Sequence, residues 1–204
     1  MTRRELLVSA MMLLPGAASA QQPQDQDPVY VFGTTVVIPS GLQGTVYYIS
    51  HSTKSLMELE KFKPRGTIYT SSLNVPTQDY MLGFPGISKR LEWFGIDYRG
   101  KFWIGTPGEY RWELTSDDGS MLYIDDKLVI DNGGMHSAIT LTGTTNLAGG
   151  IHTIRVPYFQ GIKYRVALIL KIAGPGQDLR VFSTEEFKPP TDPETWAFPA
   201  AKPK

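Results

Sequence analysis

The sequence predicts an all-β protein, an antiparallel β-sandwich or barrel formed by a single domain. Apolar and polar side chains alternate over several short stretches, which is the period of a half-buried strand. The 20 glycines and 15 prolines interrupt these stretches at intervals typical of hairpins. Helical periodicity is weak and confined to residues 56–62. Many short strands separated by turns favour a sandwich or barrel.

The expected strands are recognised by their alternation and by the turns between them. Every second side chain of residues 109–114 is apolar, and Trp112 is expected in the core. Residues 122–130 predict two strands joined by a hairpin turn at Asp125 and Asp126. The remaining predicted strands are 45–49, 94–104, 151–159 and 164–172.

The first 20 residues have the pattern of a secretion signal peptide. Two arginines precede an apolar run, 6–14, and residues 18–20 form a small-residue cleavage site. The run is too short to span a bilayer, and a retained membrane anchor is the alternative. Residues 21–40 are expected to form a flexible N-terminal segment. The protein is therefore expected to be secreted, into a periplasm or the extracellular space.

The β domain is expected over residues 41–184, followed by a proline-rich tail over residues 185–204. A tail of this composition is extended and does not form regular strand ladders. Trp196 and Phe198 in the tail either pack back onto the domain or form a docking peptide for a protein partner.

Composition excludes several classes of function. Twenty basic and twenty acidic residues balance, and no basic stripe is visible, so nucleic acid is not expected as a partner. The absence of cysteine excludes thiolate metal sites and thiol catalysis. No Gly-x-Ser-x-Gly motif indicates a serine nucleophile. The sequence therefore predicts a binding protein that is not an enzyme.

Asp117 and Asp118 are the most informative residues of the chain, because they are adjacent, end a predicted strand and precede Gly119. Neighbouring side chains of an ordinary strand point to opposite faces, so two such carboxylates hold one ion only if a cis peptide bond turns them to the same side. Calcium accepts six to eight oxygen ligands in irregular geometry, which suits such a pair. The alternative is a solvated turn, since Asp-Gly is a common hairpin signal. The pair is also too close in the chain for the two carboxylates of a glycosidase, roughly 5–9 Å apart.

Six stretches in the same order give the chain a family resemblance. The chain resembles the lectin domain named after the fourteen-kilodalton fragment of anthrax protective antigen, over about residues 41–182. The stretches are Gly-Leu-Gln-Gly-Thr-Val-Tyr (41–47), Glu-Trp-Phe-Gly-Ile-Asp-Tyr-Arg-Gly (92–100), the run 108–132 around the aspartate pair, His136, Leu-Ala-Gly-Gly-Ile-His (147–152) and Val-Pro-Tyr-Phe-Gln (156–160). The resemblance implies a β-sandwich or barrel, in agreement with the strand pattern.

The resemblance also implies a calcium and sugar site. In sugar-binding members, an aspartate pair joined by a cis peptide holds calcium, an amide side chain joins it, and sugar hydroxyls complete the coordination. The pair corresponds to Asp117 and Asp118, and the amide to Gln160, with Asn132 as the second choice. Asn132, His136 and Tyr164 are the candidate ligand-binding residues, although a turn role for Asn132 and a packed role for His136 are the alternatives. The choice of sugar is expected to lie in loops at 137–146 and 160–164.

Together these features predict a secreted, calcium-dependent carbohydrate-binding module that recognises a glycan or polysaccharide, as in adhesion. The alternative is a non-catalytic structural or protein-interaction module of the same fold, accessory to a glycosidase or to a surface complex. In that case the aspartate pair is an ordinary turn.

Overall fold

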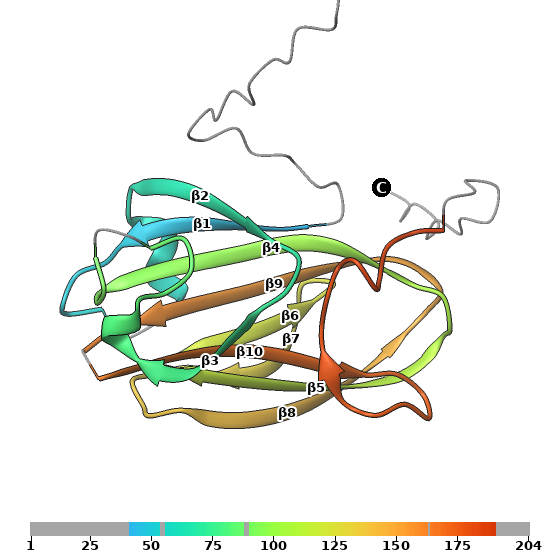
Figure 1. The fold of residues 1–204 in the computed structure, drawn as a ribbon. Coiled ribbons are helices and arrows are strands. Elements are labelled where there is room, and N and C mark those ends of the chain that lie inside the picture. Colours follow the sequence, from blue (N-terminus) through green and yellow to red (C-terminus); the bar gives the residue numbers. More distant parts are fainter. Residues whose placement is uncertain (1–40, 54–55, 88–89, 163, 191–204) are drawn as a thin grey trace, which may run out of the picture. The chain divides into compact units, whose positions relative to one another are not determined.

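The computed structural model describes residues 41–53, 56–87, 90–162 and 164–190. These residues form antiparallel strands in two sheets, with no α-helix among them, so the all-β prediction is confirmed (Figure 1). The predicted signal peptide, residues 21–40, and the aromatic residues Trp196 and Phe198 lie outside the described part of the chain. No helix in that part is long and apolar enough to cross a membrane.

The first sheet has six strands in the order β2-β1-β4-β9-β6-β7 (Figure 1). Its longest pair is β4 with β9, which runs in register from Phe94 opposite Gln160 to Ile104 opposite Gly150. The strand bounds are β1 Leu42–Tyr48, β2 Pro64–Thr70, β4 Phe94–Ile104, β6 Ser120–Ile124, β7 Lys127–Asn132 and β9 Gly150–Gln160.

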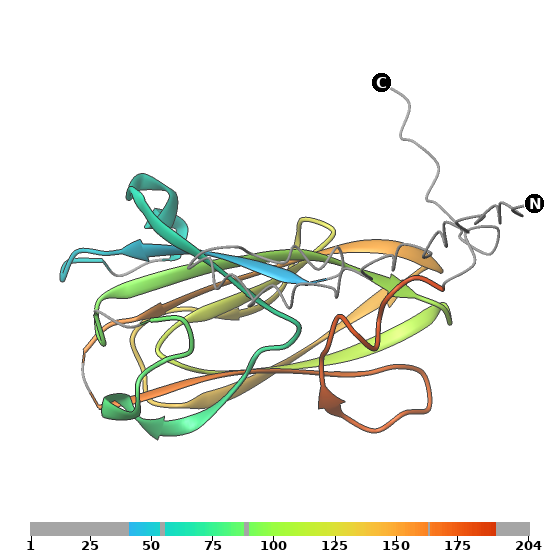
Figure 2. The ribbon, with the colours of Figure 1, turned by 45° about the horizontal axis from the view of Figure 1, so that its top comes forward.

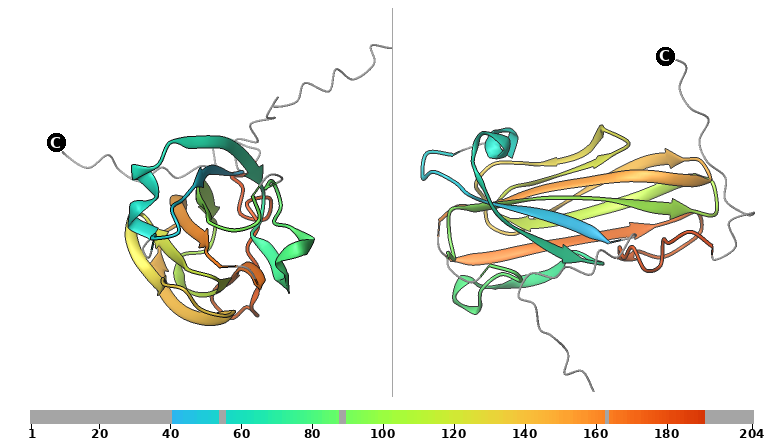
Figure 3. Two further views of the ribbon diagram at one scale, coloured as in Figure 1. Left: turned by 90° about the vertical axis from the view of Figure 1, so that its left-hand side faces the viewer. Right: turned by 90° about the horizontal axis from the view of Figure 1, so that it is seen from above.

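The second sheet has the order β11-β10-β5-β8, and β3 also pairs with β10. Turned views show the two sheets as facing layers, with strands surrounding the core in the end-on view (Figures 2 and 3). The strand bounds are β3 Asn74–Asp79, β5 Gly108–Asp117, β8 Ile139–Leu147, β10 Arg165–Ala173 and β11 Arg180–Val181. Two short 3₁₀ helices complete the fold, η1 Leu56–Lys61 and η2 Tyr80–Leu82.

The core lies between the sheets and is built by the alternation seen in the sequence. Trp112 is fully buried, as predicted, and its indole nitrogen donates to the Thr145 hydroxyl at 2.8 Å. A tyrosine or tryptophan buried in this way needs such a partner. A smaller apolar cluster attaches η1 to the first sheet, with members Tyr47, Ile49, Leu56, Leu59, Trp93 and Phe159.

Every strand predicted from alternation is present, with ends shifted by only a few residues, and Asp125 and Asp126 form the predicted turn at positive φ. Four strands were not predicted, namely β2, β3, β8 and β11. The expected loop at 137–146 is wrong beyond Ala138, because residues from Ile139 onward form β8. This strand is rich in threonine and mostly exposed, so it carries little apolar pattern; its hydrogen bonds to β5 define it. The core also extends beyond residue 184, since Phe187 is buried.

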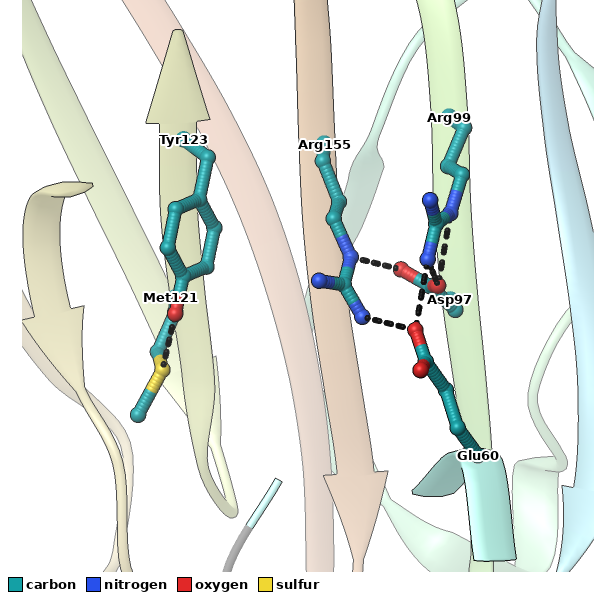
Figure 4. A network of polar contacts seen from close by, with 6 residues as sticks. All are labelled: Glu60, Asp97, Arg99, Met121, Tyr123 and Arg155. Atoms are coloured by element: carbon teal, nitrogen blue, oxygen red, sulfur yellow. Dashed lines mark hydrogen bonds and ion pairs between the residues drawn. The ribbon is translucent and has the colours of Figure 1, made fainter. Parts of the chain in front are cut away.

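A network of charged side chains joins η1 to the outer face of the first sheet (Figure 4). Asp97 is only 3 % exposed and accepts hydrogen bonds from Arg99 at 2.8 Å and Arg155 at 2.9 Å. Both guanidinium groups also contact Glu60, at 2.8 and 3.0 Å. The buried carboxylate therefore has two cationic partners, which a carboxylate needs in order to be buried in its charged form.

Candidate functional site

The aspartate pair lies in a pocket at one end of the sandwich. Asp117 is the last residue of β5, the peptide bond to Asp118 is cis, as expected, and each residue is 7 % exposed. The pocket has a volume of about 610 Å³. Its lining residues are Thr77, Asp117, Asp118, Met135, His136, Ser137, Ala138, Ile162, Tyr164 and Arg165.

The residue that follows the pair must be glycine. A Cβ atom at Gly119 would lie 2.5 Å from the ring of Phe159 and 2.6 Å from the carbonyl oxygen of Gly134. Contacts this short do not occur without movement of the neighbours. The turn after Asp118 is therefore packed directly against the backbone of Gly134, which leads to the pocket wall at Met135 and His136.

Backbone N–H groups orient both carboxylates. Asp118 accepts from the backbone nitrogen of His136 at 3.1 Å on Oδ1 and from that of Gly161 at 2.7 Å on Oδ2. Asp117 accepts from the backbone nitrogen of Ala138. The donors follow β7 and β9, so two loops distant in the sequence hold the pair in place.

The electrostatics of the pocket favour an added cation. Burial raises the pKa of Asp117, although the backbone of Ala138 partly offsets the increase. Burial also raises the pKa of Asp118, to which the neighbouring charge of Asp117 adds. The charge of Arg165, on the same pocket wall, acts to lower the pKa of Asp117, but no ion pair joins either carboxylate to a lysine or arginine within the described ranges. A hard cation bound to both carboxylates would offset the repulsion between their charges and the desolvation penalty of burying them.

Gln160 lies beside Asp118, fully buried at the end of β9. Its amide nitrogen faces three oxygen atoms: Asp118 Oδ2 at 3.4 Å, Ile162 O at 3.2 Å and Arg165 O at 3.0 Å. Its Oε1 lies 2.6 Å from the hydroxyl of Tyr158, which is also 2.7 Å from the carbonyl oxygen of Asp117.

The Tyr158 hydroxyl has one proton for these two acceptors. Rotation of the Gln160 amide by 180° would let its nitrogen donate to Tyr158 and would place its oxygen among the other three oxygens. Four oxygens facing one another are favourable only around a cation. The two carboxylates therefore fit a hard cation such as calcium. Gln160, as the structure places it, donates to Asp118 and would offer its oxygen to an ion only after that rotation.

Asn132, the second amide candidate, is also buried, with an exposed fraction of 2 %. Its amide nitrogen donates to the Ser116 hydroxyl at 2.9 Å and the Ile139 carbonyl at 3.3 Å. Its Oδ1 has no hydrogen-bond partner in the described part of the chain. A buried oxygen of this kind normally has a partner, so Asn132 also has a ligand atom to offer. It does not line the pocket itself.

His136 and Tyr164 both line the pocket, in different ways. The His136 ring nitrogens lie 2.9 and 3.0 Å from the carbonyl oxygens of Ser137 and Asn132, so the ring is held by its own loop. Tyr164 is 78 % exposed and its ring is open to a ligand.

Sequence reasoning missed three residues of the pocket wall, namely Thr77, Met135 and Arg165. Ser137, Ala138 and Ile162 fall within the two loops that were expected to set the choice of sugar. Thr77 comes from β3, which reaches the site only because β3 pairs with β10. No local pattern marks Thr77. The positions of Met135 beside His136 and of Arg165 beside Tyr164 were the available signals.

Comparison with protein families gives one match: the PA14 domain matches residues 40–181. Comparison with curated proteins gives no match. Solved structures show the same fold at low identity.

An anti-sigma factor domain-containing protein from Clostridium clariflavum is 21 % identical to this chain, with a TM-score of 0.59. The match covers 74 % of this chain but only 48 %, about half, of the Clostridium protein. The PA14 sugar-binding domain from an RTX adhesin is 18 % identical, with 71 % of this chain and 96 % of that chain covered and a TM-score of 0.56. The A domain of epithelial adhesin 9 from Candida glabrata, solved with Galβ1-3GlcNAc, is 10 % identical, with 72 % and 87 % covered and a TM-score of 0.52.

Proposed function

Because the chain belongs to the PA14 domain family, we propose that it is a carbohydrate-binding module in which calcium held by Asp117 and Asp118 contacts the hydroxyl groups of a glycan. The observation that carries the proposal is the pair of buried carboxylates in an open pocket, without a basic ion-pair partner among the described residues. Two similar solved structures, a PA14 sugar-binding domain and an adhesin domain in complex with a disaccharide, support the same role.

The chemistry of the pocket suits recognition. Calcium would act as a Lewis acid that binds neutral hydroxyl oxygens. The vicinal hydroxyls of a sugar would compete with water for positions on the ion. The protein would supply the two carboxylates and the amide of Gln160, with Asn132 as the alternative amide, oriented by backbone hydrogen bonds. His136 and Tyr164 would contact the sugar from the wall of the pocket. Since few groups contact one sugar unit, the affinity of one site is expected to be modest, and multivalent presentation would raise it.

Calcium titration calorimetry tests the metal site. The wild-type protein is expected to bind calcium, and Asp118→Asn is expected to weaken binding at least tenfold, because it removes one of the two charged ligands. Asp178→Asn, an exposed aspartate outside the pocket, is the matched control and should bind like the wild type. Equal affinity in the wild type and Asp118→Asn would refute the assignment of the site.

A glycan array tests the sugar. Binding is expected in calcium and not in EDTA, and Asp118→Asn should lose it in both conditions. Binding that persists in EDTA would mean that the ion is not part of the sugar site. If no glycan binds although calcium does, the sugar-binding part of the proposal is wrong and the ion has a structural role.

A further inference from the structure

A second pocket lies beside the first and is not part of the aspartate site. Its volume is about 350 Å³, within the roughly 300–1,000 Å³ range of ligand pockets. It is formed by the segment after β1, by η2 and by the segment before β4. Its lining residues are His51, Tyr80, Met81, Arg90, Leu91, Glu92 and Trp93.

The two pockets share a wall, which we call the dividing segment and which consists of Gly161, Ile162 and Tyr164. Ile162 and Tyr164 line the first pocket. On the other side, the backbone nitrogen of Tyr80 donates to the carbonyl of Tyr164, and that of Trp93 donates to the carbonyl of Gly161, each at 3.2 Å. Tyr80 is thus bonded to a lining residue of the first pocket, and Trp93 is bonded to the residue that precedes Ile162.

Exposed apolar side chains lie along this boundary. Tyr164 is 78 % exposed, Met81 is 66 % exposed and Ile162 is 49 % exposed. Large apolar side chains exposed next to binding pockets commonly mark contact surfaces. The apolar face of a sugar ring packs on side chains of this kind, with its hydroxyls directed to polar groups on either side.

The second pocket supplies such polar groups. Arg90 donates to the carbonyl oxygen of Ile49 at 3.4 Å, and its guanidinium lies 5.2 Å from the centre of the Tyr48 ring. A guanidinium carries five donors, and among the described residues the Ile49 carbonyl is the hydrogen-bond acceptor given for Arg90, so other N–H groups can serve a ligand. Glu92 adds two acceptor oxygens. Behind them, the rings of His51 and Trp93 lie 4.9 Å apart and close the pocket.

We propose that the second pocket is a subsite for a further unit of an oligosaccharide whose first unit binds at Asp117 and Asp118. The inference rests on the proposed function and extends it, because it assigns the protein to oligosaccharides in preference to single sugars. Arg90 and Glu92 hydrogen-bond the hydroxyls of the further unit, and Met81 and Tyr164 support the chain between the two pockets.

Calorimetry at saturating calcium tests the subsite. The probes are the methyl glycosides of glucose, galactose, mannose and xylose, each compared with a linear trisaccharide of the same sugar. For the sugar that binds, the trisaccharide is expected to bind at least tenfold more tightly than the methyl glycoside. The double variant Arg90→Gln/Glu92→Gln should lose this gain and keep the affinity for the methyl glycoside.

The matched control is Glu109→Gln/Arg111→Gln, which changes the same two residue types at exposed positions of β5 and should keep the full gain. Circular dichroism confirms that both variants are folded. The subsite is refuted if the trisaccharide binds no more tightly than the methyl glycoside, or if its tighter binding survives in Arg90→Gln/Glu92→Gln. Either result leaves the proposed calcium site unaffected. If none of the probes binds, the subsite proposal fails, and the glycan array decides the proposed function separately. If Asp118→Asn binds the probes like the wild type, the proposed function fails together with the subsite.

Discussion

Replacement of Gly119 by alanine tests the packing that underlies the aspartate pair. The added Cβ would lie 2.5 Å from the ring of Phe159, 2.6 Å from the carbonyl oxygen of Gly134 and 2.9 Å from its nitrogen. Two of these atoms belong to the backbone, and Phe159 is fully buried, so neither neighbour has a free path away. Something must move by roughly half an ångström or more, and overpacking of this kind costs about 1–3 kcal/mol.

The expected loss in the free energy of unfolding is about 2 kcal/mol, which lowers Tm by roughly 4–8 °C in a protein of this size. Urea and thermal unfolding, followed by tryptophan fluorescence and circular dichroism, measure it. Gly66→Ala is the matched control: a Cβ there has nothing within 4 Å, so stability should stay within about 0.5 kcal/mol of the wild type. The reasoning fails if Gly119→Ala is as stable as the wild type, or if Gly66→Ala loses as much.

Two further predictions concern buried and partly buried charges. Asp97→Asn removes the charge that holds two arginines and should lower the free energy of unfolding by about 2–3 kcal/mol. Glu60→Gln should cost under about 1 kcal/mol, because the Glu60 side chain is 62 % exposed. Similar losses for the two variants in urea unfolding would contradict the burial argument. Partial burial acts to raise the pKa of Asp125, but hydrogen bonds from His152 and Thr153 outweigh it and lower the pKa below the usual 3.8. This stabilisation is therefore present above about pH 4 and lost as the pH falls through the folded-state pKa. Since the carboxylate is 45 % exposed, Asp125→Asn should cost only about 0.5–1 kcal/mol at pH 7, and the difference should vanish near pH 2; a difference that stays constant over this pH series would refute the linkage.

Strands with one buried face were predictable, and strands without one were not. Trp112 and its neighbours in β5 alternate because one face of that strand meets the core. In contrast, β2 contains no fully buried residue, and β8 buries only Leu147 at its end. Such strands form because their backbone groups pair with a neighbour already in place, β1 for β2 and β5 for β8. A backbone partner that comes from elsewhere in the chain leaves no mark on the side-chain pattern.

The candidate site divides in the same way. The importance of Asp117 and Asp118 follows from their position before Gly119 at the end of a strand. The second pocket did not follow from any motif, because Arg90, Glu92 and Trp93 meet Tyr80 and Met81 only after β3 and β4 have joined different sheets. The role of Gln160 was predicted from a resemblance, but its contacts with Tyr158, Ile162 and Arg165 required the fold.

By itself, the sequence determined the fold class, most of the core strands and the pair of acids, because alternation and adjacent residues are local properties that burial and charge act on directly. Only the tertiary structure decided what surrounds those acids: the backbone donors of His136 and Gly161, the wall from β3, and the neighbouring pocket. These groups are distant in the chain and meet through strand pairing across the sheets, so their positions depend on the packing of the whole domain.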